Sequence, residues 1–150
     1  MKRIFGRYAE DRNIEVEIEA ETDLEAPMVP PALYNGLALN LYTNALKAVT
    51  AKAGRKAGKI CFRARNTDRW HILEVLDTGI GIPSALHERV FDPLFTTTTN
   101  SDRDPLGSGM GLGLALVRRG AEAFGGKAEV IAAPSEYSTC IQIRLPLSES

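Results

Sequence analysis

The sequence lacks several features that would each assign it to a particular class of protein. It has two cysteines in 150 residues, Cys61 and Cys140, far apart and without metal-ligand spacing, so it offers neither a disulfide framework nor a zinc site. No hydrophobic run approaches the roughly 20 residues that a membrane-spanning helix needs. The N-terminal MKRIFGRYAEDRN has no hydrophobic stretch of a secretion signal. A formal net charge of −1 gives no reason to expect a surface for nucleic acid or anionic membrane.

What remains is the composition of an ordinary globular protein. Residues are 44% hydrophobic and 25% charged, close to the average for globular domains. A length of 150 residues suits one domain with a proper core. We therefore expect one domain over residues 1–150, with both cysteines reduced and within strands, in a cytoplasmic protein.

The hydrophobic periodicity predicts the elements. Residues 13–21 alternate apolar residues with Glu15, Glu17 and Glu19, which predicts a half-buried strand whose glutamates face solvent. A long helix is expected over residues 32–53, after two prolines that suit a helix start.

The rest of the chain continues this alternation of helices and strands. Further strands are expected at 60–66, 70–77, 127–133 and 139–147, with a short helix at 84–90 and a longer one at 111–124 that Gly125 and Gly126 end. This order predicts an α+β fold, a two-layer sandwich with helices on one face of a mixed, mainly antiparallel sheet.

One stretch, GSGMGLGLAL at residues 107–116, places glycine at every second position four times. No Gly-Lys-Ser/Thr closes it, so it is not a P-loop, and Leu112 occupies the third position of the dinucleotide fingerprint. The polar segment 96–106 before it has one proline and no periodicity, which predicts a mobile loop.

Four stretches in order resemble the nucleotide-binding boxes of the superfamily of gyrase, heat-shock chaperone, histidine kinase and mismatch-repair ATPases (GHKL, the Bergerat fold). NLYTNALKA is similar to the N-box, DTGIGIP to the first glycine box, FDPLF to the F-box and GSGMGLGLAL to the second glycine box. The F-box, together with AFGGKAEV, resembles the sensor histidine kinases in particular. That resemblance implies the ATP-binding catalytic domain of such a kinase. Phe91 and Phe95 are expected to pack as hydrophobic anchors, with contact to a phosphoacceptor domain as a second possibility.

In the N-box, Asn40, Asn44 and Lys47 are spaced i, i+4 and i+7, so a helix carries them on one stripe. The amide oxygen of Asn44 suits Mg²⁺, which takes few protein ligands when phosphates and water fill the rest, and Asn40 is a possible second contact. Lys47 can reach a phosphate oxygen. The plain alternative is a polar, solvent-facing helix.

Asp77 ends a strand and enters the first glycine box, where Gly79, Gly81 and Ile82 follow. A carboxylate there can accept a hydrogen bond from the exocyclic amine of adenine. The resemblance makes Asp77 the residue that selects the base, helped through water by Thr139. The alternative is that DTGIG is an ordinary tight turn.

The second glycine box completes the predicted site. Backbone N–H groups at a bend before a helix suit a polyphosphate, and in the kinases this region closes as a lid, here at about 96–108. Its expected nucleotide-binding residues are Gly107, Ser108, Gly109, Met110, Gly111 and Leu112.

Asn40 also bears on the type of reaction. Hydrolysing members of the superfamily carry a glutamate general base at this position, and a neutral amide cannot accept that proton. The resemblance and Asn40 together favour transfer of the γ-phosphoryl group of Mg-ATP to a histidine. A serine kinase of the anti-sigma-factor type and an ATP-gated clamp or ATPase module remain alternatives.

The resemblance also implies partners. About 30 residues precede the N-box helix, so the histidine would lie on a separate dimerisation and phosphoacceptor domain, in a longer parent or in trans, with a response regulator downstream. We expect no nucleic acid and no direct membrane contact, although parent kinases are often anchored. An isolated domain is expected to be a monomer that transfers little on its own.

Overall fold

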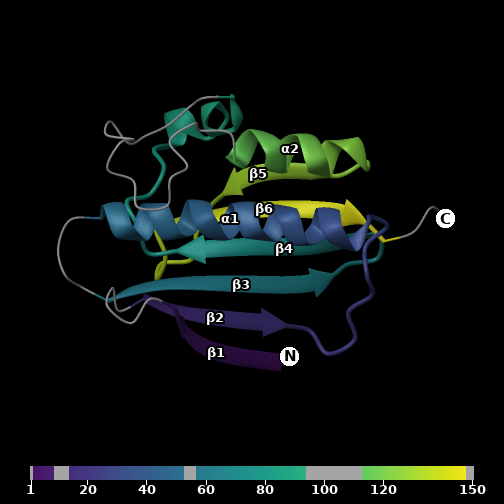
Figure 1. Ribbon diagram of the computed structural model, residues 1–150, viewed down its shortest axis with the longest axis horizontal. Helices are drawn as coiled ribbons and strands as arrows, with labels where there is room; N and C mark the ends of the chain where they lie inside the picture. The colour runs from purple at the N-terminus through teal and green to yellow at the C-terminus, as the bar shows by residue number, and fades with distance from the viewer. Residues whose placement is uncertain (1, 9–13, 53–56, 94–112, 148–150) are drawn as a thin grey trace.

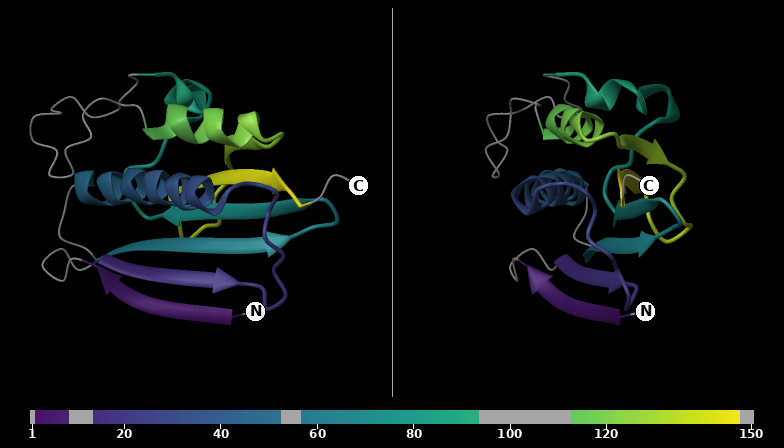
Figure 2. Two further views of the ribbon diagram at one scale, coloured as in Figure 1. Left: turned by 45° about the vertical axis from the view of Figure 1, so that its right-hand side comes forward. Right: turned by 90° about the vertical axis from the view of Figure 1, so that its right-hand side faces the viewer.

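The computed structural model describes residues 2–8 as backbone, and residues 14–52, 57–93 and 113–147 in full. In this part of the chain, six strands form one sheet and two α-helices lie on one of its faces (Figures 1 and 2). The strands are β1 (Lys2–Tyr8), β2 (Ile14–Ala20), β3 (Gly58–Asn66), β4 (Trp70–Asp77), β5 (Lys127–Ile131) and β6 (Thr139–Pro146). The helices are α1 (Pro31–Ala51) and α2 (Gly113–Ala123), and two 3₁₀ turns, η2 (Ser84–Leu86) and η3 (Arg89–Phe91), lie between them in sequence.

The sheet has the order β1-β2-β3-β4-β6-β5. Only β2 and β3 pair in parallel among the described strands, and α1 connects them. Parallel neighbours need a crossover of this kind, whereas antiparallel ones can be joined by a short turn. The predicted fold class, two helices on one face of a mixed and mainly antiparallel sheet, is confirmed.

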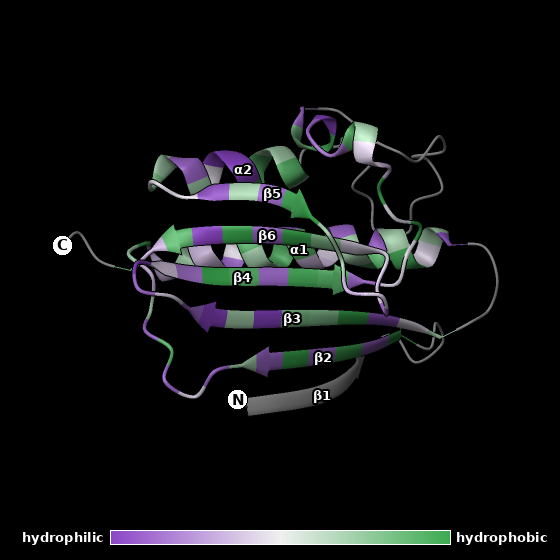
Figure 3. Cartoon of the chain, turned by 180° about the vertical axis from the view of Figure 1, so that it is seen from behind, coloured by the Kyte–Doolittle hydropathy of each residue, from purple (hydrophilic) through white to green (hydrophobic). Residues whose placement is uncertain are grey.

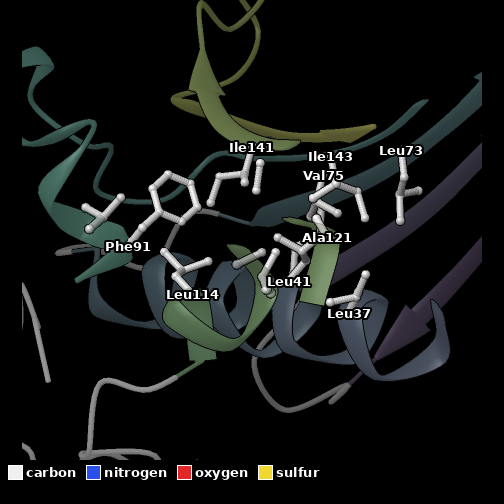
Figure 4. Close-up of a cluster of buried hydrophobic side chains, with 14 of the residues drawn as sticks. Leu37, Leu41, Leu73, Val75, Phe91, Leu114, Ala121, Ile141 and Ile143 are labelled. Atoms are coloured by element: carbon white, nitrogen blue, oxygen red, sulfur yellow. The ribbon is translucent and has the colours of Figure 1, made fainter. Parts of the chain in front are cut away.

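The hydrophobic core lies between the helices and the sheet (Figure 4). Both helices contribute buried residues, and the facing positions of β4 and β6 supply the other half; these are Leu37, Leu41, Leu114, Ala121, Leu73, Val75, Ile141 and Ile143. Phe91 of η3 is 4% exposed and joins this core, as expected of an anchor. Phe95 lies outside the described residues. Within the described part of the chain, neither helix combines the length and hydrophobicity needed to cross a bilayer.

Most predicted elements are present. Gly125 adopts φ +85° after α2, and the N–H of Gly126 donates to the carbonyl of Ala121 at 2.8 Å, so the predicted glycine end of this helix is confirmed. The predicted helix at 84–90 is instead the pair of 3₁₀ turns.

β1 was not predicted. It pairs with β2, which lies between β1 and β3 in the sheet.

The prediction that the glutamates of β2 face solvent was wrong for two of the three. Glu17 and Glu19 are 3% and 8% exposed, whereas Ile18 is 41% exposed. The glutamates lie on the outer face of the sheet, which α1 and α2 do not cover, and each pairs with a cation of β3. Lys59 Nζ lies 2.9 Å from Glu17, and Arg63 Nε 3.0 Å from Glu19. Neighbouring strands and long cationic side chains therefore bury these carboxylates, and such pairing is what permits their burial.

Seen from this outer side, each strand from β2 to β6 carries hydrophilic residues along its length (Figure 3). Among them lies a small apolar cluster of Cys61, Leu76, Tyr137 and Cys140. Both cysteines are free, buried and within strands, as predicted. Burial raises the pKa of Cys140 to about 12, so this thiol stays protonated and unreactive at neutral pH.

Candidate functional site

The site begins where β4 ends and β6 starts. Asp77 and Thr139 are directly paired across these antiparallel strands, so both side chains lie on the same face of the sheet, the one that the helices cover. The N–H of Ser138 donates to the backbone carbonyl of Asp77 at 2.8 Å, which fixes the two strand ends together. Asp77 is 1% exposed and Thr139 4% exposed.

The Asp77 carboxylate is buried with little compensation. Its Oδ1 accepts a hydrogen bond from the N–H of Gly79 at 2.8 Å. Among the described residues, this is the one hydrogen bond to the Asp77 side chain. Desolvation raises the pKa of Asp77 to about 6, although the Gly79 bond and the charge of Lys52 act to lower it. A carboxylate has room for about four hydrogen bonds, so Asp77 retains most of its capacity to accept.

Thr139 beside it is also incompletely bonded. Its Oγ1 is buried and finds no hydrogen-bond partner among the described residues. Leaving a buried hydroxyl unpaired costs about 1–3 kcal/mol, and native structures seldom tolerate this without a bound water or ligand. Asp77 and Thr139 together therefore form a corner with unused donor and acceptor capacity, which suits a ligand that offers both.

The turn after Asp77 packs directly on α1. The N–H of Ile80 donates to the carbonyl of Ala48 at 3.2 Å, and a Cβ on Gly79 would lie 2.4 Å from the carbonyl carbon of Ala48. Gly79 is therefore required by the contact between turn and helix. Gly81 has φ +79°, a conformation that residues with a side chain rarely adopt.

Two further contacts hold this turn. The Nζ of Lys52 donates to the carbonyl of Thr78 at 3.2 Å, and Nε2 of His87 donates to the carbonyl of Ile82 at 3.0 Å. Lys52 was not among the site residues predicted from the sequence, because its contact with Thr78 depends on how the end of α1 lies over the turn. No spacing signal within residues 32–53 marks it.

The α1 stripe of Asn40, Asn44 and Lys47 is half-buried. Asn40 Oδ1 lies 3.9 Å from the position of a Cβ on Gly113, the first residue of α2. The stripe therefore runs along the side of α1 that faces the start of α2. Amide oxygens are suitable ligands for Mg²⁺, so Asn40 and Asn44 fit a metal held between a polyphosphate and α1.

The structure thus brings Asp77, Thr139 and the first glycine turn together at one end of α1. The second glycine box, from Gly107 to Leu112, lies outside the described residues, so its contribution to the site stays a prediction. Of the predicted nucleotide-binding residues, those within the described part of the chain lie on α1, at the end of β4, in the turn after it or at the start of β6.

Comparison with known proteins identifies the family. Residues 32–149 match the family described as histidine kinase-, DNA gyrase B-, and HSP90-like ATPases. The adaptive-response sensory kinase SasA of Synechococcus sp. is 32% identical over 136 residues, covering 91% of this chain and 33% of that relative. The sensor histidine kinase ZraS of Salmonella typhimurium is 36% identical over 129 residues, covering 85% and 25%.

Among solved structures, the mycobacterial sensor histidine kinase MprB superposes with a TM-score of 0.71 at 26% identity, covering 91% of this chain and 85% of that one. The chain spans a third or less of the length of the two kinases named above.

Proposed function

The chain belongs to the family of histidine kinase-, DNA gyrase B- and HSP90-like ATPases, and we propose that residues 1–150 act as one ATP-binding catalytic domain that donates a γ-phosphoryl group to a histidine. The histidine would lie on a dimerisation and phosphoacceptor domain, and a response regulator would receive the group from it. The similarity to sensor kinases supports this assignment.

The observation that carries the proposal is the unsatisfied pair of Asp77 and Thr139. The exocyclic amine of adenine is a donor, which the anionic Asp77 carboxylate accepts at its remaining positions. Guanine presents a carbonyl oxygen at the equivalent place, and two acceptors repel each other. The Thr139 hydroxyl, unpartnered among the described residues, can donate to a ring nitrogen of the base directly or through a water.

The phosphates are proposed to extend from the base along α1. Lys47 offers a positive charge on the same stripe as Asn40 and Asn44, and the backbone N–H groups of residues 107–112 are proposed to bind the phosphate oxygens. Mg²⁺ bound by Asn44, with Asn40 as a second contact, would neutralise phosphate charge during transfer. The chain's own contribution to the reaction is then chiefly positioning.

Transfer is favoured over hydrolysis by what α1 carries. Its 21 residues include no aspartate or glutamate, so the helix offers no carboxylate to take a proton from an attacking water. Asn40 lies where hydrolysing members of the superfamily place such a base, and its amide cannot perform this step.

The test is to follow the label from γ-labelled ATP in the presence of Mg²⁺. One reaction contains the chain alone, and the other adds a phosphoacceptor hairpin from a sensor kinase encoded in the same genome. We expect label on the hairpin histidine and almost no free phosphate. The variant Asp77→Asn is the matched control, since its weaker binding should strongly reduce transfer at low ATP. Rapid phosphate release from the chain alone would contradict the proposal, as would label on serine.

A further inference from the structure

We propose that Arg118 is a positioning residue for phosphoryl transfer, because its side chain joins η3, α2 and β5 and so sets where α2 begins relative to Asn40. This inference rests on the proposed function. It concerns the phosphate side of the site and leaves recognition of the base to Asp77 and Thr139.

The contacts of Arg118 involve three separate elements. Its Nη1 and Nη2 donate to the two carboxylate oxygens of Glu88 at 3.1 and 3.3 Å, and Nη2 also donates to the carbonyl of Ala128 in β5 at 2.9 Å. The guanidinium carbon lies 3.9 Å from the centroid of the Phe91 ring. The Arg118 guanidinium also lowers the pKa of Glu88, so this carboxylate remains ionised.

This arrangement needs an arginine. A planar guanidinium can bind both oxygens of a carboxylate, a backbone carbonyl and an aromatic face at once, whereas a lysine ammonium is a point charge without a flat face. The Arg118 side chain is 22% exposed and that of Glu88 80% exposed, so the ion pair lies at the surface while the guanidinium stacks on the buried Phe91 ring. Arg119, the next residue, is exposed and offers a natural comparison.

The packing of α2 on the sheet does not rest on these contacts alone. The core face of α2, with Leu114, Val117 and Ala121 all buried, holds the helix against the sheet by hydrophobic packing. Hydrophobic burial is non-directional, so hydrogen bonds and an ion pair add to how precisely the helix is placed. What Arg118 adds is a directional anchor that connects the middle of α2 to η3 on one side and to β5 on the other.

The anchor matters because of what lies at the first residue of α2. Gly113 faces Asn40, whose Oδ1 is 3.9 Å from the position of a Cβ on that glycine. A shift of α2 therefore changes the surroundings of the proposed metal and phosphate ligands on α1. Asp77, Gly79 and Thr139 are held by β4, β6 and the end of α1, and none of the Arg118 contacts described above reaches them.

The test compares Arg118→Met and Arg118→Lys with Arg119→Met in the hairpin-labelling assay. We expect Arg118→Met to lower kcat for transfer by about tenfold, since misplacement by an ångström costs up to about a hundredfold, with the affinity for ADP changed by less than about twofold. Arg118→Lys should recover part of the rate through a single ion pair with Glu88. Arg119→Met should transfer at the wild-type rate.

Two results would overturn the inference. One is an unchanged kcat in Arg118→Met. The other is an equal loss of kcat and ADP affinity accompanied by a lower melting temperature, which would make Arg118 merely structural. The wild-type protein in the same assay distinguishes failure of this inference from failure of the proposed function, because an inactive wild type means that the proposed transfer itself is wrong.

Discussion

The two ends of β4 each carry a buried ionisable side chain on the face that the helices cover, and their surroundings differ sharply. His71 is 3% exposed and Asp77 1% exposed. His71 donates from Nδ1 to Oδ1 of Asn66 at 2.9 Å and accepts at Nε2 from the Tyr34 hydroxyl at 2.7 Å. Both ring nitrogens are thus bonded. Among the residues that the structure describes, Asp77 accepts from one backbone N–H, and the Thr139 hydroxyl beside it has no hydrogen-bond partner.

This difference is the one expected between a structural polar group and a group that binds a ligand. At the His71 end, the network continues from Asn66 Nδ2 to the carbonyl of Glu25 at 3.3 Å, and so ties the segment before α1 to the sheet. Satisfied networks of this kind stabilise a fold. At the Asp77 end, the carboxylate and the Thr139 hydroxyl keep hydrogen-bonding positions that no described residue uses, and a bound nucleotide would use them.

The largest expected effect comes from substituting Asp77, and it is a loss of ATP affinity. Asp77→Asn should lower ATP affinity by about 10- to 100-fold, because it removes a charge-assisted hydrogen bond of about 1.5–3 kcal/mol and can place an amide donor against the adenine amine. Isothermal titration calorimetry measures this. Wild-type affinity in the variant would exclude Asp77 from the site.

The same end should respond to pH. Because ATP binds the ionised form, its affinity should fall below about pH 6, the raised pKa of Asp77, by up to about tenfold for each pH unit. Asp77→Asn corrects for titration of the ligand itself, so the difference between the two profiles carries the prediction. Parallel profiles would contradict it.

Stability of the unliganded protein should change in the opposite sense. The pKa of Asp77 is raised from 3.8 to about 6 in the folded state, so the associated stability is present below the ordinary value and is lost as pH rises through 6. The Asp77→Asn variant has no carboxyl group at this position and therefore does not lose this stability. Its melting temperature relative to wild type should therefore rise between about pH 4 and 6 and remain higher above. Burial lowers the pKa of His71, but that contribution is common to both proteins.

Removing a hydrogen bond to His71, at the other end of β4, should lower stability and leave ATP binding unchanged. Tyr34→Phe removes the hydroxyl that bonds His71 Nε2, so a buried acceptor loses its partner and the free energy of unfolding should fall by about 1–3 kcal/mol. Denaturant titration measures the loss. An accompanying drop in ATP affinity would show that the two ends are not independent.

The smallest expected effect sharpens the comparison. Thr139→Val keeps the side-chain shape and removes a hydroxyl that has no partner among the described residues. ATP affinity should fall by about fivefold, the value of an ordinary hydrogen bond near 1 kcal/mol, and the free energy of unfolding should stay the same or rise. A clear loss of stability would mean that the hydroxyl is already satisfied in the unliganded protein.

The sequence predicted much of this fold because the signals are local. Period-2 alternation and helical periodicity identify β2 to β6, α1 and α2, and the double glycine identifies the end of α2. β1 was missed because KRIFGRY has no clean alternation. The glutamates of β2 were expected to face solvent, because alternation within one strand does not show which cations a neighbouring strand brings near. Glu17 and Glu19 pair with Lys59 and Arg63 on the outer face.

The site was predicted from the order of the sequence motifs, and motifs do not predict which residues pair across neighbouring strands. Asp77 and the glycine turn were identified by their box, and Thr139 by resemblance. Their direct pairing across β4 and β6 follows from the topology of the sheet. Lys52 and Arg118 gave no signal, because each acts on residues that only the folded chain brings near, at Thr78 and at Glu88 and Phe91.

The central claim is that the corner of Asp77 and Thr139 selects adenine. The most direct measurement is calorimetric titration of the wild-type protein with ATP and with GTP at one Mg²⁺ concentration and at pH 8, where Asp77 is ionised. The account predicts that ATP binds and that GTP binds at least about tenfold more weakly, since the guanine carbonyl faces a buried carboxylate. Equal affinity for the two nucleotides, or binding of neither, would contradict it.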